Sequence, residues 1–169
     1  MPKKKAAKLS HYDRRGRAVM VDVSRKPATR RQARAHAFVK MKPQVVRRIR
    51  RLETPKGDPL EVARIAGIAA AKRTAELVPF CHPLPLTHVE VGVELCQNGV
   101  RLRSSVRSKG PTGVEMEALT AVAVGALTVY DMCKALDPAM EVQDIYLVEK
   151  KGGRSGLFRR RPRVSARPS

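Results

Sequence analysis

The sequence of 169 residues has no tryptophan, and aromatic residues make up only 4% of it. RNA-binding modules usually stack bases on exposed aromatic rings, so this scarcity argues against base stacking as the main activity. The three cysteines include no Cys-x-x-Cys pair, and Cys81-His82 has no second ligand pair at zinc spacing. We therefore expect a reduced, cytoplasmic protein without a structural metal.

Long apolar runs are also missing. No run is long enough to span a membrane, and residues 1–10 lack the apolar segment of a signal peptide. We therefore expect no membrane segment. The length suits one domain with a substantial core.

Acidic residues are few, 15 against 35 lysines and arginines, which gives a formal net charge of +20. Eleven of these charges lie in residues 1–17 and 159–169. We predict a flexible basic segment at 1–19, one folded domain at 20–158 and a disordered Arg-rich tail at 159–169. These tails can bind polyanions weakly, so a nucleic-acid-binding module is the alternative interpretation of the chain.

Periodicity predicts the first half of the fold. Residues 31–41 alternate apolar and polar side chains, which predicts a strand. A short Arg-rich helix is expected at 43–52. A second helix follows Asp58, which is a suitable N-cap, with Pro59 at the first helical position and Glu61 completing a capping-box pattern.

A hairpin, a long helix and a final strand follow. Asn98-Gly99 predicts a two-residue turn between two alternating runs. This turn would place four pairs opposite each other: Leu95 and Leu102, Val91 and Val106, Glu94 and Arg103, Glu90 and Arg107. With a last strand at 141–150, the order predicts an α+β, ferredoxin-like sandwich with a four-stranded antiparallel sheet and helices on one face.

The long helix, expected at 112–136, has charged residues only near its two ends. Thr112 and Glu115 form a capping-box pattern, and Pro138 follows the last turn. Glu117 and Asp131 are fourteen residues apart on one face, which is roughly 20 Å along the axis. They serve either different sites or one site completed by two copies of the chain.

Two further features each have two interpretations. Asp131 and Lys134, three residues apart, could form an acid/base pair or only a helix-end ion pair, and spacing alone favours the ion pair. The proline-rich loop at 78–86 stiffens Cys81 and His82. It could hold a ligand or be a buried kink with a satisfied histidine.

Six segments in order resemble the molybdenum cofactor biosynthesis protein C family, the cyclic pyranopterin monophosphate synthases. The most specific are CHPLPL at 81–86 and TGVEMEALTA at 112–121, and the others are MVDVS (20–24), KGD (56–58), ARIAGIAAAKRT (63–74) and LTVYDMCKA (127–135). The resemblance extends from about residue 9 to residue 158. Lys151 departs from it, because a serine is usual there.

The resemblance implies a lyase without a redox cofactor. Its substrate would be 3′,8-cyclo-7,8-dihydroguanosine 5′-triphosphate, and its products cyclic pyranopterin monophosphate and pyrophosphate. The implied catalytic residues are Asp131, Lys56 and Lys134, with a lysine pKa tuned toward neutrality. The implied substrate-binding residues are Phe80, Cys81, His82, Met116, Glu117 and Arg31. A hexamer built as a trimer of dimers, with sites at the dimer interface, is also implied.

Overall fold

The computed structural model describes residues 11–153 and 156–161. The elements in order are β1 (Thr29–Lys40), α1 (Pro43–Arg50), α2 (Pro59–Lys72), α3 (Thr74–Leu77), β2 (Leu86–Cys96), β3 (Gly99–Gly110), α4 (Glu115–Cys133), β4 (Glu141–Lys151) and β5 (Phe158–Arg159). The outer parts of the two segments for which we predict flexibility, 1–10 and 162–169, lie outside the described residues. The proposed domain boundaries stay a prediction.

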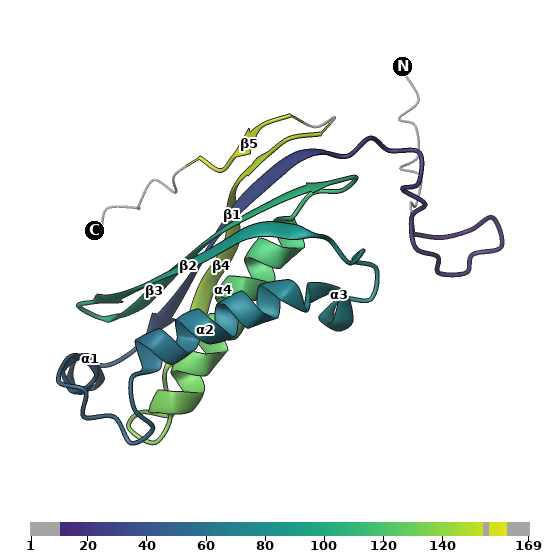
Figure 1. The fold of residues 1–169 in the computed structure, drawn as a ribbon. Coiled ribbons are helices and arrows are strands. Elements are labelled where there is room, and N and C mark those ends of the chain that lie inside the picture. Colours follow the sequence, from purple (N-terminus) through teal and green to yellow (C-terminus); the bar gives the residue numbers. More distant parts are fainter. Residues whose placement is uncertain (1–10, 154–155, 162–169) are drawn as a thin grey trace, which may run out of the picture.

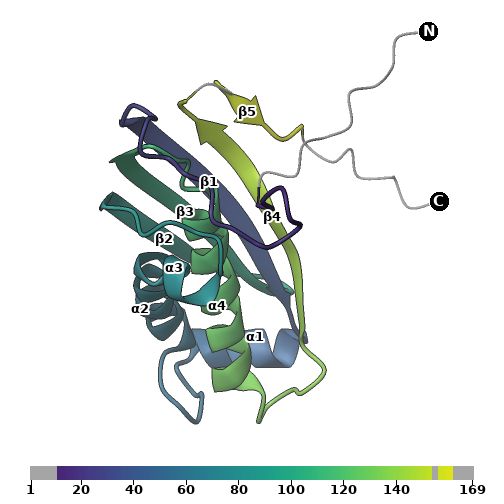
Figure 2. The ribbon, with the colours of Figure 1, turned by 90° about the vertical axis from the view of Figure 1, so that its right-hand side faces the viewer.

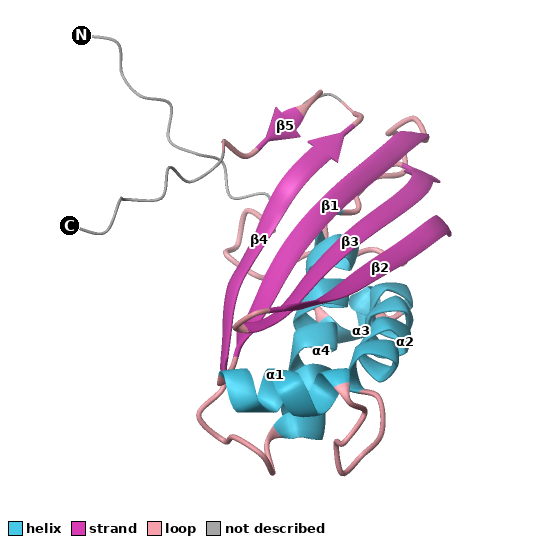
Figure 3. Cartoon of the chain, turned by 90° about the vertical axis from the view of Figure 1, so that its left-hand side faces the viewer, coloured by secondary structure: helices cyan, strands magenta, loops and turns pink. Residues whose placement is uncertain are grey.

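One antiparallel sheet in the order β2-β3-β1-β4-β5 forms one layer, and α2 and α4 form the other (Figure 1). Figure 3 shows α1 to α4 on the same side of the sheet or at its end, so none of the described helices covers the other face. The α+β, ferredoxin-like prediction is confirmed. The two-residue β5, which pairs with β4, extends the four predicted strands at one edge.

The alternation of β1 builds the centre of the core. Ala33, Ala35, Ala37 and Val39 are at most 1% exposed, whereas the residues between them face away from the helices. Small alanine side chains let α4 lie close to the sheet, which explains why a strand contains so many of them despite their helical preference. The predicted strand is therefore confirmed.

The helices α2 and α4 lie against each other as well as against the sheet (Figure 2). Glycines permit the contact: a Cβ atom at Gly67 would lie 2.8 Å from the backbone oxygen of Ala121. At Gly125 it would lie 2.7 Å from the side chain of Leu102. By length and composition α4 could cross a membrane, but half of that window is buried inside the protein, as in the core helix of a globular domain.

The N-cap and the first helical residue of α2 are as the sequence indicates, but the predicted capping box is not completed, because the carboxylate of Glu61 accepts a hydrogen bond from Arg64 instead. The carboxylate of Asp58 accepts hydrogen bonds from the backbone N–H groups of Leu60 (2.9 Å) and Glu61 (3.4 Å), and Pro59 occupies the first helical position. Glu61 contacts Arg64 at 3.0 Å.

The predicted capping box of α4 is wrong. The helix begins at Glu115 with Val114 as its N-cap residue, and no side chain caps it. The carboxylate of Glu115 accepts a hydrogen bond from the ammonium group of Lys150 at 2.8 Å. Thr112 and Gly113 form part of a cavity wall instead.

The predicted hairpin register is also wrong, by two residues. Leu95 pairs with Val100, and Glu94 lies opposite Arg101, because the turn consists of Gln97 and Asn98. Gly99 already belongs to β3, where a Cβ atom would lie 2.2 Å from the backbone oxygen of Val39. The glycine is needed for this close approach between strands. Since the shift is even, every side chain keeps its predicted face.

Candidate active site

Two lysines hold one carboxylate at the C-terminal end of α4. The ammonium nitrogen of Lys56 lies 2.6 Å from Oδ2 of Asp131, and that of Lys134 lies 2.8 Å from Oδ1. Lys56 also donates to the backbone oxygen of Asp131 at 3.3 Å. All three side chains are about half exposed, so their outer atoms are open to solvent or to a ligand.

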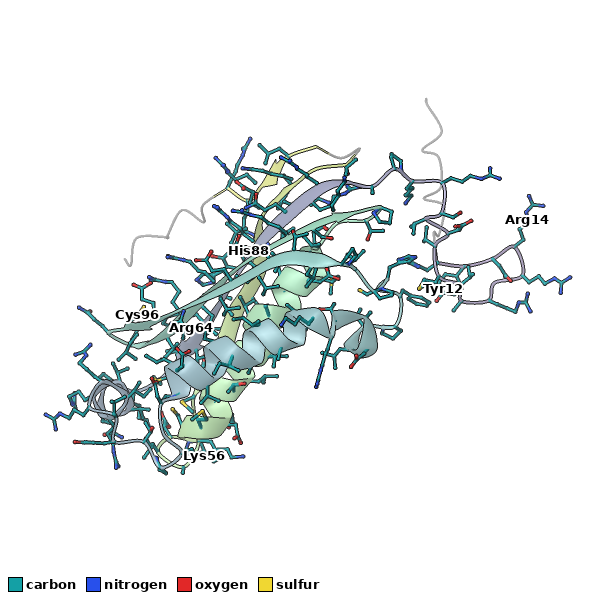
Figure 4. The ribbon with its side chains drawn as sticks, viewed as in Figure 1. Tyr12, Arg14, Lys56, Arg64, His88 and Cys96 are labelled. Atoms are coloured by element: carbon teal, nitrogen blue, oxygen red, sulfur yellow. The ribbon has the colours of Figure 1, made fainter. Side chains whose placement is uncertain are left out.

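The Lys-Gly-Asp turn before α2 places Lys56 in this cluster. Gly57 has a φ of +87°, in the left-handed region that favours glycine. This turn leaves Asp58 to cap α2 while Lys56 points toward α4, as Figure 4 shows near the foot of the two helices. Each residue of the Lys-Gly-Asp motif thus has its own structural role: Lys56 pairs with Asp131, Gly57 forms the turn and Asp58 caps α2.

The ion pairs fix the charges of the cluster. Hydrogen bonds from Lys134 and Lys56 lower the pKa of Asp131 to about 2, so it is ionised at neutral pH. The same contact with Asp131 raises the pKa of Lys134. In this single subunit the expectation that Lys134 is tuned toward neutrality is therefore wrong, because the carboxylate stabilises its charged form.

A cavity of 410 Å³ lies at the opposite, N-terminal end of α4. Five of the residues implied by the resemblance line it: Phe80, Cys81, His82, Met116 and Glu117. Glu117 is only 4% exposed, and its pKa is raised by burial and by the nearby charge of Glu115. Burial, and the charge of Glu117, also raise the pKa of the Cys81 thiol.

The proline-rich loop is held by its neighbours. Nε2 of His82 donates a hydrogen bond to the backbone oxygen of Val21 at 2.9 Å. The ring of Phe80 stacks on that of His11, with centroids 4.8 Å apart. His82 is therefore both satisfied by the backbone and part of the cavity wall, so both interpretations of the loop are compatible.

Arg31 lies on the helix side near the beginning of β1. It donates to the backbone oxygens of Gly110 (3.3 Å) and Pro111 (3.1 Å), just before α4. It lines a second cavity, of 560 Å³, which shares Lys26, Thr112 and Gly113 with the first. Arg31 is thus next to the Glu117 cavity.

The single chain does not bring the two groups together. The cavity group contains Glu117 and the lysine cluster contains Asp131. These two residues are separated by roughly 20 Å along the axis of α4. Within the described residues, no three His, Cys, Asp or Glu side chains are close enough together to hold a metal ion.

A family model described as the MoaC family matches residues 20–153. The chain belongs to the MoaC family. The match covers both groups of candidate site residues, and it confirms the family that the six sequence motifs suggest.

Curated relatives agree. A protein of Mycobacterium tuberculosis (strain ATCC 25618 / H37Rv) named cyclic pyranopterin monophosphate synthase 1 is 56% identical over 156 residues, 92% of each chain. The cyclic pyranopterin monophosphate synthase of Thermomicrobium roseum is 55% identical, over 91% of this chain and 94% of its own. That of Roseiflexus sp. (strain RS-1) is 55% identical, over 89% and 96%.

Sequence reasoning missed several residues at the cavity of this MoaC chain. His11, Lys26 and Glu115 line it, and Lys150 holds Glu115. Lys26 and His11 lie in irregular segments where no periodicity marks a functional face. The pair of Lys150 with Glu115 joins residues 35 positions apart, so only the placement of β4 beside α4 reveals it.

Proposed function

We propose that this MoaC chain is a cyclic pyranopterin monophosphate synthase, a lyase of molybdenum cofactor biosynthesis. It converts 3′,8-cyclo-7,8-dihydroguanosine 5′-triphosphate into cyclic pyranopterin monophosphate and pyrophosphate. The names of relatives more than half identical support the reaction. The observation that carries the proposal is Asp131 held between Lys56 and Lys134 at an exposed helix end.

The lysines act on the phosphates. Closing the cyclic phosphate breaks a phosphoanhydride bond, and negative charge grows on the departing pyrophosphate. The ammonium groups of Lys56 and Lys134, already oriented by Asp131, stabilise that charge. Because its pKa is raised, Lys134 stays protonated and serves as a fixed positive charge.

The cavity at the other end of α4 binds the purine-derived ring. Its 410 Å³ lies within the usual size of a small-molecule site. Glu117, whose pKa is raised, and His82 hydrogen-bond the ring, while Phe80, Cys81 and Met116 form the apolar wall. Arg31, beside this cavity, binds negative charge through its guanidinium.

One substrate can touch both groups when two subunits form the site. The roughly 20 Å between Glu117 and Asp131 exceeds the reach of one small molecule within a subunit. In a dimer with two-fold symmetry, the Glu117 end of one subunit would face the Asp131 end of its partner. We propose such dimers, three of them forming a hexamer. The three free cysteines support a cytoplasmic location.

Mixing two inactive variants tests the shared site. Glu117→Gln and Lys134→Ala are each expected to lose turnover of the cyclised GTP intermediate, measured by pyrophosphate release. After subunit exchange, half of the dimers are mixed, and each has one intact site, so about a quarter of wild-type activity returns.

A matched control uses two variants of the same helix end. Mixing Lys56→Ala with Lys134→Ala restores nothing, because each site then has one defective lysine cluster. If mass spectrometry shows exchange but the first mixture stays inactive, the shared site is refuted. If the wild-type chain releases no pyrophosphate, the reaction itself is refuted.

A further inference from the structure

A second cationic cavity adjoins the candidate active site at Arg31 and is lined mainly by residues on the face of the sheet that no described helix covers. Its volume is 530 Å³, and it lies where β1 begins and where β3 and β4 end. Its cationic lining residues are Arg30, Arg31, Arg107, Lys109 and Lys151. None of the described residues that line it is acidic.

Strand register places four of these cations on one face in two rows. Lys151 and Arg107 flank Gln32 on either side of β1, and Arg30 lies opposite Lys109 in the next row. Strands are ~4.8 Å apart, and rows on the same face are ~7 Å apart. Arg31 belongs to the residues of β1 that face the helices, and it donates to carbonyl oxygens on that side. It therefore lies between this cavity and the active-site cavities.

Acidic partners are distributed unevenly over this face. Farther along β3, Arg101 contacts Glu94 at 3.1 Å, and Arg103 contacts the same carboxylate at 3.9 Å. Lys151 contacts Glu149 at 3.2 Å. Within residues 11–153 and 156–161, by contrast, Arg30, Arg107 and Lys109 form no ion pair. Like charges directly opposite each other on a sheet are destabilising, as at Arg30 and Lys109.

We propose that this cavity is a second anion site, which binds a compact oligophosphate such as pyrophosphate, tripolyphosphate or the triphosphate group of a nucleotide. An oligophosphate concentrates several negative charges over a short length, which matches the three unpaired cations Arg30, Arg107 and Lys109 in two neighbouring rows. Arginine donors suit phosphate oxygens in pairs. Binding would also remove the repulsion between Arg30 and Lys109.

The same face is less suited to nucleic acid. Readers of single strands stack bases on free aromatic rings. Here Tyr146 already stacks on His36, with ring centroids 4.9 Å apart, and the guanidinium of Arg160 lies 4.6 Å from the Tyr146 centroid. Phosphate contact is therefore the main interaction that the cavity provides.

Calorimetric titration of the full-length chain with tripolyphosphate and pyrophosphate tests the site. We expect the double variant Arg107→Ser/Lys109→Ser to bind tripolyphosphate at least tenfold more weakly than wild type. The matched control is Arg101→Ser, on the same strand and face but paired with Glu94, which should change affinity less than twofold. Both variants retain the terminal segments, so any binding there is common to both.

Two further measurements separate this site from the active site. Lys134→Ala should keep tripolyphosphate binding at the cavity, and the Arg107/Lys109 variant should keep pyrophosphate release within twofold of wild type. Equal losses for the double variant and Arg101→Ser would overturn the proposal, as would loss of turnover in the double variant. Binding of a single-stranded RNA that tripolyphosphate does not displace, with no binding of tripolyphosphate itself, would also overturn it.

Discussion

Replacing Gly67 by alanine tests the contact between the two long helices. The new Cβ atom would lie 2.8 Å from the backbone oxygen of Ala121 and 3.3 Å from two methyl groups of Val91. An ordinary contact of a carbon atom needs ~3.5 Å, so the two helix backbones must separate by about 0.7 Å. A backbone oxygen inside a helix cannot rotate away.

Two opposing effects set the magnitude. Overpacking in a core costs ~1–3 kcal/mol. Alanine in a helix interior is favoured over glycine by ~1 kcal/mol. We therefore expect Gly67→Ala to lower the free energy of unfolding by about 1 kcal/mol, or Tm by ~2–4 °C for a chain of this size. Urea unfolding followed by circular dichroism measures it.

Gly125→Ala is the matched control. Its Cβ atom would meet a terminal methyl of Leu102 at 2.7 Å, which can move, and the backbone oxygen of Ala63 at 3.2 Å. We expect a smaller loss than at Gly67. If Gly67→Ala instead stabilises the protein by the full propensity difference of ~1 kcal/mol, the close approach of α2 to α4 is refuted.

Three further outcomes follow from buried groups and tight contacts. In urea titrations at several pH values, Glu117→Gln should reduce the fall in the free energy of unfolding that wild type shows as pH rises above about 4.5. Burial raises the pKa of Glu117 above its ordinary 4.5, so stability is full below that value and falls as pH rises through the raised pKa. The same variant should speed iodoacetamide alkylation of Cys81, whose pKa is raised by burial and by Glu117, while an unchanged Cys81 rate would contradict this coupling. Gly99→Ala should cost about 2 kcal/mol or more, because its Cβ atom would lie 2.2 Å from the oxygen of Val39, and a neutral result would refute the strand contact.

The features of the fold that the sequence predicts correctly depend on residues close together in the chain. The alternation of β1 and the Asp58-Pro59 start of α2 depend on neighbouring residues, and both appear as expected. The cluster of Asp131 with Lys134 is local in the same sense, since the residues are three apart. Lys56 could be assigned to this cluster only from the family resemblance, because 75 positions separate it from Asp131.

The wrong predictions have a common physical cause. Glu115 has the spacing of a capping residue, yet an ion pair with Lys150 from another element takes its carboxylate. Gly99 has the position of a turn residue, yet the neighbouring strand β1 needs the space beside it. In both cases a tertiary contact outweighs a weak local preference, and no local pattern contains that contact.

Among the described residues, helices cover only one face of the sheet, so alternate residues along the strands are under different constraints. Along β1 and β3, every second residue is constrained by the volume of the core, and the residues between them meet no helix. Substitutions at the residues that meet no helix do not change the packing density of the core. The charge of the outer face can therefore change while the residues around α4 keep their packing, so new binding properties can arise without loss of the existing reaction.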